Sequence, residues 1–338
     1  MVEKFNFYDI YGYLLPGLML VGLLWTPFGL FWRAWPQQEI SSAILLFLLA
    51  YIAGHFIQGF AFVIIPSKTN KFGAYREFSD LLLDNDDLTL AQQTKYRINE
   101  LSKKHFGLDL ETGADSKVAQ NSISRRRSSA FFQARSALLK YKGERASYWE
   151  QFEGLYALMR GATMAAAAAT FYFLGWAIAL LDHHAGLGWT KGFLLVFGTA
   201  AFVCALAQKI PKTKKRDWPK IFTWGTAISL CLLLFGSAML VAKNAVEHDQ
   251  KAAGERHPIS ICCLWPAWTG AAEGKDSTKP EEVFINAGDR GLIMLLLMLA
   301  AAIVSLRCHG AYKAFAREFA LAVWRDFANF EMMATKTG

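Results

Sequence analysis

The chain has 338 residues, of which 54% are hydrophobic, 14% aromatic and 19% charged, and its formal net charge is +8. Because the apolar residues gather in long blocks that lack a polar face, an ordinary soluble globular fold is excluded. The positive charge lies in the segments between these blocks. We interpret it as a signature of membrane topology, with nucleic-acid binding as the weaker interpretation.

The chain opens with FNFYDIYGYLLPG, which leads directly into the first apolar block. Asn6 is placed to cap a helix, with Asp9 at the third position, where a negative charge suits the helix dipole. Tyr11 and its neighbouring tyrosines suit the membrane interface, and Pro16 predicts a kink one turn into the helix. A positive n-region and a prompt cleavage site are missing, so we expect this segment to be retained rather than removed as a signal peptide.

Six apolar blocks are long enough to cross a membrane, because about 20 apolar residues in a helix match the ~30 Å hydrocarbon core. None of the block interiors carries an obligate charge. The blocks lie at 14–32, 40–65, 162–181, 191–207, 221–242 and 291–305. The predicted fold class is therefore all-α: a polytopic helical membrane protein with about six transmembrane helices and a helical cytoplasmic insert.

The orientation follows from Lys and Arg in the short loops. The loop at 208–220 holds six basic residues in 13, whereas the loops at 33–39 and 182–191 hold one each. This difference places 208–220 in the cytoplasm. Counting spans from there places both termini and residues 66–160 in the cytoplasm, and it places 244–290 outside.

The insert is expected to consist of helices. The segment at 71–83 has apolar residues at helical spacing. A capping box of Thr89 and Gln92 predicts a second helix that ends at Phe106. A third helical pattern covers 117–142.

Helical patterns also continue the apolar blocks into the polar segments. One such pattern runs from residue 144 into the third span. The tail after the sixth span is amphipathic, and we expect it to pack on the insert, to mediate oligomerisation or to lie on the bilayer. The predicted organisation has five parts. They are 1–65 with the opening helix and spans one and two, 66–160 as the cytoplasmic insert, 161–243 with spans three to five, 244–290 as the external loop, and 291–338 with span six and its amphipathic continuation.

Two polar residues, His55 and Gln58, share one face of the second span. Polar side chains in hydrocarbon need partners, which leaves two interpretations. One is a pore-lining or proton-sensing role. The other is a hydrogen bond that fixes packing, with Tyr51, a tyrosine of the first span or Asp9. Gly54 and Gly59 would allow close backbone approach near this face.

Three arginines, Arg125, Arg126 and Arg127, lie beside four serines in the insert. Guanidinium forks match phosphate groups, so one interpretation is a site for a phosphorylated or otherwise anionic ligand. The alternative is a solvated basic face near the membrane.

The adjacent Cys262 and Cys263 fall in the external segment, where they either form a disulfide with each other or another subunit, or remain half-buried thiols. The chain has no Cys/His metal spacing, no phosphate-binding GxxxxGK[ST] loop, and neither HExxH nor GxSxG. We therefore expect no metal, no cofactor and no enzymatic activity.

With FNFYDIYGYLLPG at its start and AYIAGHFIQGF in the second span, the chain resembles a loose group of uncharacterised bacterial inner-membrane proteins. These share an aromatic-Asp-aromatic opening, a Leu-x-Pro-Gly first span and a Gly-His-x-x-Gln second span. The resemblance covers about the first 65 residues. It implies a location in a bacterial inner membrane, and because some members lie near phage-defence genes it favours a defence effector.

These patterns favour an oligomeric membrane effector whose cytoplasmic helices sense a signal or partner and whose spans perturb or conduct across the membrane. The alternative is a non-catalytic scaffold that recruits a soluble partner through the insert and tail. A transporter or membrane enzyme is less favoured, because the spans carry no carboxylate. The expected partners are the lipid bilayer, further copies of the chain, and a soluble protein or phosphorylated signal at the insert.

Overall fold

The structure is a computed structural model whose described parts divide by their contacts into two units. It describes residues 9–32, 40–65, 68–71, 74–110, 117–142, 148–185, 235–245 and 287–330. Unit one comprises the described parts of 1–16, 54–161 and 307–338, and unit two those of 17–53 and 162–306. The predicted insert, 66–160, therefore belongs to the same unit as the opening segment and the C-terminal tail.

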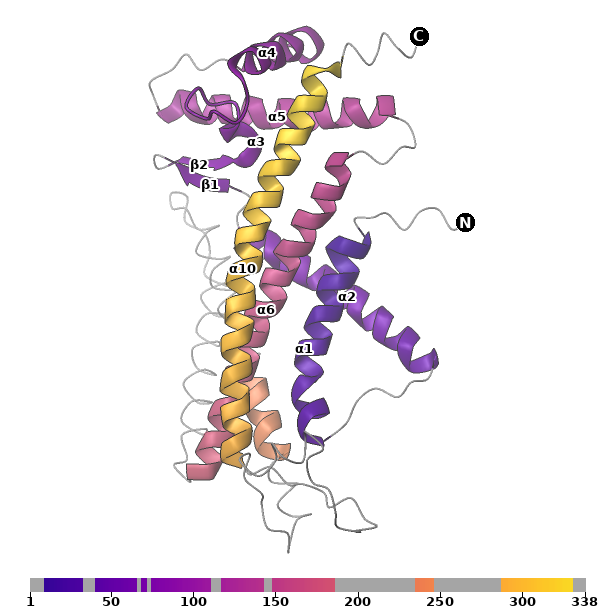
Figure 1. The fold of residues 1–338 in the computed structure, drawn as a ribbon, viewed down its shortest axis with the longest axis vertical. Helices are drawn as coiled ribbons and strands as arrows, with labels where there is room; N and C mark the ends of the chain where they lie inside the picture. Colours follow the sequence, from indigo (N-terminus) through magenta and orange to yellow (C-terminus); the bar gives the residue numbers. More distant parts are fainter. Residues whose placement is uncertain are drawn as a thin grey trace, which may run out of the picture. The chain divides into compact units, whose positions relative to one another are not determined.

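Helices dominate both units, as the all-α prediction requires, and a single short ribbon of two strands is present among the described residues. Residues 235–245 add a further helical stretch. The labelled elements in chain order (Figure 1) are η1 (Asp9–Leu14), α1 (Leu15–Trp32), α2 (Ile40–Ile64), β1 (Lys68–Lys71), β2 (Ala74–Glu77), α3 (Phe78–Leu81), α4 (Gln92–Phe106), α5 (Lys117–Lys142), α6 (Tyr148–Ala185) and α10 (Ala287–Ala328).

Four of the described helical segments are long and apolar enough to cross a membrane, and they match the first, second, third and sixth predicted blocks. The fourth predicted block, 191–207, lies outside the described residues, as does the fifth up to residue 234. The membrane class of the protein is thus supported, while the count of six spans and the side on which the termini lie stay predictions. The segments are Asp9–Phe31, Ile40–Phe62, Trp149–Ala185 and Ala287–Ala328.

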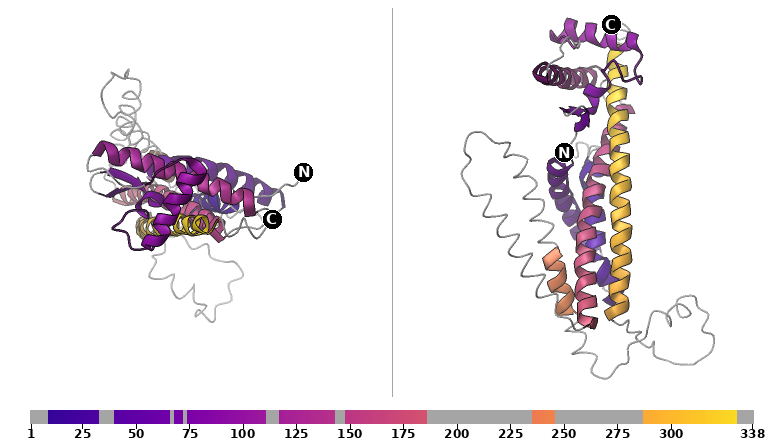
Figure 2. Two further views of the ribbon diagram at one scale, coloured as in Figure 1. Left: turned by 90° about the horizontal axis from the view of Figure 1, so that it is seen from above. Right: turned by 90° about the vertical axis from the view of Figure 1, so that its left-hand side faces the viewer.

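Unit two is packed through small residues on its helices. A Cβ added to Gly175 would lie 2.7 Å from the carbonyl oxygen of Phe235, and one added to Gly291 would lie 2.8 Å from Leu181 Cγ. The hydroxyl of Ser305 donates a 3.0 Å hydrogen bond to a backbone carbonyl of α6. Close backbone approach of this kind is typical of helices associated within membranes. Within this unit α6 and α10 run side by side (Figure 2).

Large apolar side chains remain exposed on the helices of unit two. Contiguous apolar surface of this kind is rare on soluble proteins, and it fits hydrocarbon. On α2 these residues are Ile40, Ile44, Leu45, Phe47, Leu48, Leu49 and Ile52, and on α10 they are Leu292, Leu296, Leu299, Ile303, Val304 and Leu306.

Unit one has its own core, in which the insert helices pack on the C-terminal part of α10. Trp324 and Phe327 of α10 are fully buried in the same cluster as Ile98 of α4 and Leu138 of α5. The indole N–H of Trp324 donates a 2.9 Å hydrogen bond to the carbonyl of Ser79. Of the three uses considered for the amphipathic tail, packing on the insert is the one present in the structure.

The segment at 71–83 differs from the single predicted helix. Its central residues form β2, which pairs antiparallel with β1 so that Lys71 faces Ala74, and only Phe78–Leu81 is helical. The helical spacing of apolar residues was therefore misleading here.

The predicted capping box at Thr89 and Gln92 is also wrong. Helix α4 starts at Gln92, and its N-cap residue makes no side-chain capping hydrogen bond. The Thr89 hydroxyl accepts a hydrogen bond from Arg317 Nη2 instead, and its N–H donates to Asp87 Oδ1 at 2.9 Å. The end of α4 at Phe106 and the bounds of α5 agree with prediction, and Gly107 adopts the left-handed φ of 68° that favours glycine after a helix.

Candidate functional site

A buried polar cluster joins the opening segment, α2 and α6 within unit one. Its members are the side chains of Gln58 and Arg160 and the backbone carbonyls of Gly12 and Ala157, and we call it the Gln58 cluster. It brings together the two segments that carry the family resemblance.

The opening segment supplies the first carbonyl because of Pro16. A proline has no N–H, so the Gly12 carbonyl, four residues earlier, has no α-helical donor. This carbonyl accepts a 2.6 Å hydrogen bond from Gln58 Nε2. At this point the π-helix η1 gives way to the α-helix α1, which begins at Leu15, and the kink expected from Pro16 stays a prediction. The predicted cap at Asn6 lies outside the described residues.

Gln58 uses its whole hydrogen-bonding capacity, although only 1% of the residue is exposed. Its two amide hydrogens serve two carbonyls, that of Gly12 and that of Ala157 at 2.7 Å. Its Oε1 accepts from Arg160 Nη2 at 3.0 Å and from Arg160 Nε at 3.2 Å. One neutral side chain thus ties together three segments that are distant in sequence.

Arg160 is the buried charge of the cluster, with 2% exposure. Among the described residues no carboxylate lies within ion-pair distance of its guanidinium. The guanidinium instead lies over the ring of Phe62, 3.5 Å from the ring centre, and 5.7 Å from that of Tyr156. Amide oxygen and aromatic faces therefore compensate part of the desolvation of the cation.

Two glycines allow the backbones to approach at the cluster. A Cβ on Gly54 would lie 1.8 Å from the carbonyl oxygen of Tyr13, and one on Gly161 would lie 2.7 Å from the ring of Pro16. The close approach expected of Gly59 is absent, since a Cβ there would meet no described atom within 4 Å. The spacing of Gly59 in the helix turns it away from η1, towards open space.

His55 lies beside the cluster and stacks on Tyr13, with ring centres 3.9 Å apart and planes 17° apart. The contact packs His55 against a tyrosine of the opening segment by ring stacking, and the predicted hydrogen bond of His55 stays a prediction. A pore-lining or proton-sensing role stays a prediction, as does an ion pair with Asp9. Tyr11 and Asp9 are half-buried within η1.

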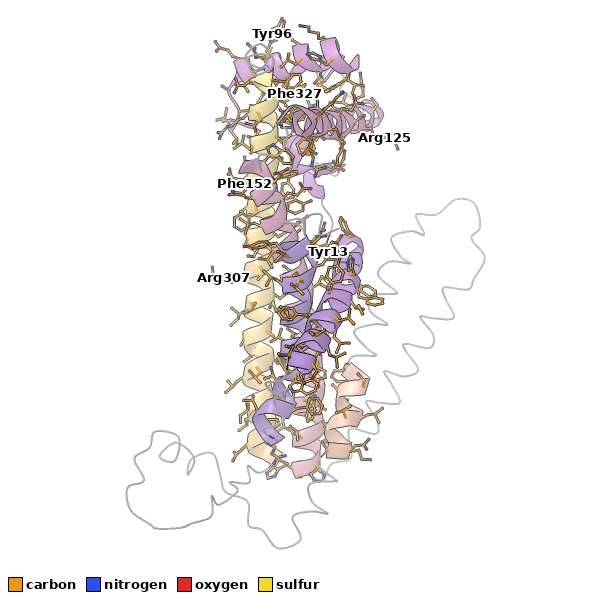
Figure 3. All side chains as sticks on the ribbon, turned by 90° about the vertical axis from the view of Figure 1, so that its right-hand side faces the viewer. Tyr13, Tyr96, Arg125, Phe152, Arg307 and Phe327 are labelled. Atoms are coloured by element: carbon orange, nitrogen blue, oxygen red, sulfur yellow. The ribbon has the colours of Figure 1, made fainter. Side chains whose placement is uncertain are left out.

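The three arginines proposed for anion binding separate in the structure. Arg125 and Arg126 are exposed on α5, and Figure 3 shows Arg125 on this helix. Arg127 is 1% exposed, and its Nη1 donates to the carboxylates of Asp80 and Asp84 at 2.9 and 3.0 Å. A solvated fork formed by all three residues is therefore excluded, because Arg127 is an internal partner of these carboxylates.

Two further expectations concern metals and disulfides. Within the described ranges no group of three or more His, Cys, Asp or Glu side chains is placed to hold a metal ion. Cys262 and Cys263 lie outside the described residues, so their oxidation state stays a prediction.

Sequence reasoning missed Arg160, which it counted with the insert. The available signal was its position, because it lies directly before the third apolar block in the segment LMRGATMAAAAA. A cation at the edge of a span needs a polar partner, and Gln58 is the residue in the second span that can supply one.

No protein-family model, no curated protein and no solved structure matches this chain.

Proposed function

We propose that the protein is an effector of the bacterial inner membrane, acting as a homo-oligomer with both termini in the cytoplasm. In this proposal unit one receives a signal in the cytoplasm, and the apolar spans perturb or conduct across the bilayer. The resemblance of the opening segment and second span favours a role in phage defence.

The observation that supports the proposal is the continuity of three helices between the units. Helices α2, α6 and α10 each begin in one unit and end in the other. The insert shares the core of unit one with the start of α6 and with the C-terminal part of α10. A change in the insert would therefore act directly on helices whose other halves are apolar enough to lie in a membrane.

The Gln58 cluster is the part of unit one best suited to couple such a change. All four of its hydrogen bonds are buried, and they join η1, α2 and α6. A small sliding of α6 would leave a buried cation and a buried carbonyl without partners, which is costly. The cluster therefore favours discrete arrangements over gradual ones, as a switch requires.

The proposal is tested by measuring membrane potential in bacteria that express the chain. A potential-sensitive dye is followed in single cells during infection with a panel of phages. We expect depolarisation before lysis in cells with the wild-type chain, and none in cells with Gln58→Leu at equal membrane abundance. The Gly59→Ala variant, which alters an open position on the same helix, serves as the matched control.

An intact potential in every infected culture would remove the effector function. Capture of a soluble protein by the full chain under those conditions, lost on disrupting the insert, would then favour the scaffold. The oligomeric state is measured separately, from the mass of the purified chain in lipid nanodiscs.

A further inference from the structure

A small polar pocket lies within unit one, away from the Gln58 cluster. Its volume is about 240 Å³, below the range usual for drug-sized ligands, so it suits a small metabolite. Its lining contains two cations and no carboxylate. The polar residues that line it are Asn85, Gln92, Lys95, Tyr96, Asn99 and Arg127.

Lys95 is a buried cation of this lining with hydrogen-bonding capacity left. It is 7% exposed, and its ammonium donates to the carbonyls of Asp84 and Asp87. An ammonium has three N–H groups, so one remains without a partner among the described residues. Within that part of the chain no carboxylate lies within ion-pair distance of the Lys95 ammonium. The carboxylate of Asp87, which binds Arg317, is near enough for the charge of Lys95 to help lower its pKa.

Asn99 offers a second donor group. It is 6% exposed, and its Oδ1 accepts a 2.7 Å hydrogen bond from the N–H of Leu110. This bond fixes the orientation of the amide, so Nδ2 is the free end. Its two N–H groups have no hydrogen-bond partner in the described part of the chain.

Arg127 offers a third donor group. Its Nε donates to the Leu110 carbonyl at 3.2 Å, and its Nη1 to the carboxylates of Asp80 and Asp84. Its Nη2 makes no hydrogen bond to any described residue. Three largely buried side chains that line one pocket thus hold N–H donors that the described part of the chain does not use, and these donors are available to an acceptor in the pocket.

We propose that this pocket binds a small metabolite through a phosphate or carboxylate group. The oxyanion accepts hydrogen bonds from Lys95, Asn99 and Arg127, and the remainder of the molecule lies against the exposed side chains of Gln92 and Tyr96. Oxygen anions are the acceptors that match such a set of charged and neutral N–H donors. The further statement that this ligand is the signal for the membrane rests on the proposed function, whereas binding itself does not.

The test is direct titration of the full chain in lipid nanodiscs at constant ionic strength. Three probes are compared by calorimetry: inorganic phosphate, ribose 5-phosphate and succinate. We expect saturable binding of at least one probe at one site per chain. Binding of the phosphates alone identifies a phosphorylated ligand, and binding of succinate alone identifies a carboxylate.

Two variants locate the site. Asn99→Asp keeps the acceptor for the Leu110 N–H but replaces the free donor with an anionic oxygen. Gln92→Glu adds a negative charge at an exposed position, so folding is preserved. Each should weaken binding about tenfold or more, because each sets a charge against the oxyanion. The matched control is Arg125→Gln with Arg126→Gln, which removes two exposed cations outside the pocket and should change the dissociation constant less than about twofold.

Absence of saturable binding for all three probes would overturn the proposal. So would unchanged binding in Gln92→Glu, or loss of binding in the Arg125/Arg126 variant. These results are separable from the proposed function. If the chain binds a probe but leaves the membrane potential intact, the pocket proposal stands and the effector function is removed. If the chain depolarises cells without binding any probe, the effector function stands and the pocket proposal is overturned.

Discussion

At the scale of single residues, the choice of glutamine at position 58 has a physical reason. Two segments, η1 and α6, present two carbonyl oxygens and one guanidinium to the same side chain. An amide meets both kinds of partner without carrying a charge itself, which matters for a residue inside an apolar helix. A glutamate would attract Arg160 but would place anionic oxygen against the carbonyls of Gly12 and Ala157.

The first prediction concerns the coupling of Gln58 and Arg160. Gln58→Leu should lower the free energy of unfolding by about 3 kcal/mol, because it leaves a buried guanidinium without its acceptor. The double variant Gln58→Leu/Arg160→Leu should lose less than the sum of the two single changes, by about 1–3 kcal/mol. Unfolding of the purified chain in detergent measures all three variants. Additive losses would show that the two side chains do not act as a unit.

The second prediction uses two glycines of α2. Gly54→Ala places a methyl group 1.8 Å from the Tyr13 carbonyl oxygen, so η1 must shift, and overpacking of this kind costs about 1–3 kcal/mol. Gly59→Ala meets open space and should be neutral or stabilise the helix by up to about 1 kcal/mol. Melting temperatures in detergent compare them. Equal effects at both positions would contradict the close approach of η1 and α2.

At the scale of elements, the C-terminal part of α10 is a structural member of the insert. The third prediction is that Trp324→Ala destabilises unit one by about 3–5 kcal/mol, because the indole is fully buried. Trp324→Phe should cost less, chiefly the hydrogen bond to the Ser79 carbonyl, worth about 1 kcal/mol. Limited proteolysis of residues 66–160 reports the loss. The exposed Glu318→Ala on the same helix is the control, and cleavage as fast as in Trp324→Ala would refute the assignment.

The turn before α4 is tied to α10 by an ion pair that should depend on pH. Arg317 Nη2 lies 3.0 Å from Asp87 Oδ2. Burial acts to raise the pKa of Asp87, but the hydrogen bonds from Thr89 and the charges of Arg317 and Lys95 outweigh it and hold that pKa below its usual range. A carboxylate with a depressed folded pKa stabilises above its unfolded pKa and loses this contribution as the pH falls through the folded value.

The fourth prediction follows from the lowered pKa of Asp87. The melting temperature of Asp87→Asn should lie below that of the wild type by a constant amount between pH 8 and pH 5, and the difference should shrink below about pH 4. The half-exposed pair of Lys103 and Asp109 provides the control, and Asp109→Asn should have little effect at any pH. A difference that grows as the pH falls would contradict the depressed pKa.

Local signals were sufficient for some elements and insufficient for others. The bounds of α5 and the end of α4 at Gly107 follow from residues within one turn, so sequence reasoning located them. The Thr89 capping box failed because Arg317, 228 residues away in the sequence, binds the hydroxyl that should have capped the helix. Arg160 was missed for the same reason, since its acceptor Gln58 is 102 residues away. Side chains that pair over such a separation leave no periodic pattern in the sequence. Only the general rule that a buried cation needs a partner indicates that such a pair exists.

At the scale of the whole molecule, the segment at 186–286 decides the topology. With six spans the basic loop 208–220 would lie on the same side as both termini, and the positive-inside preference predicts that this side is the cytoplasm. If only the four described spans crossed the bilayer, both termini would still share one side, but the loop would lie on the opposite side from them. The side on which the termini lie therefore does not distinguish the two topologies, whereas the side on which the loop lies does.

The fifth prediction is that Thr213→Cys, in a chain otherwise free of cysteine, resists a membrane-impermeant maleimide in intact cells. Thr278→Cys, in the predicted external segment, should be labelled, and Ser129→Cys, exposed on α5, should be protected until the cells are opened. Because the loop holds six basic residues, its transfer across the bilayer would oppose the positive-inside preference. If positions 213 and 278 are both labelled, the loop is external and only the four described spans cross the bilayer. The protection of Ser129→Cys would then be the sole indication that the termini lie in the cytoplasm. Protection of 213 with labelling of 278 requires a crossing on each side of the loop, which the blocks at 191–207 and 221–242 are long enough to supply.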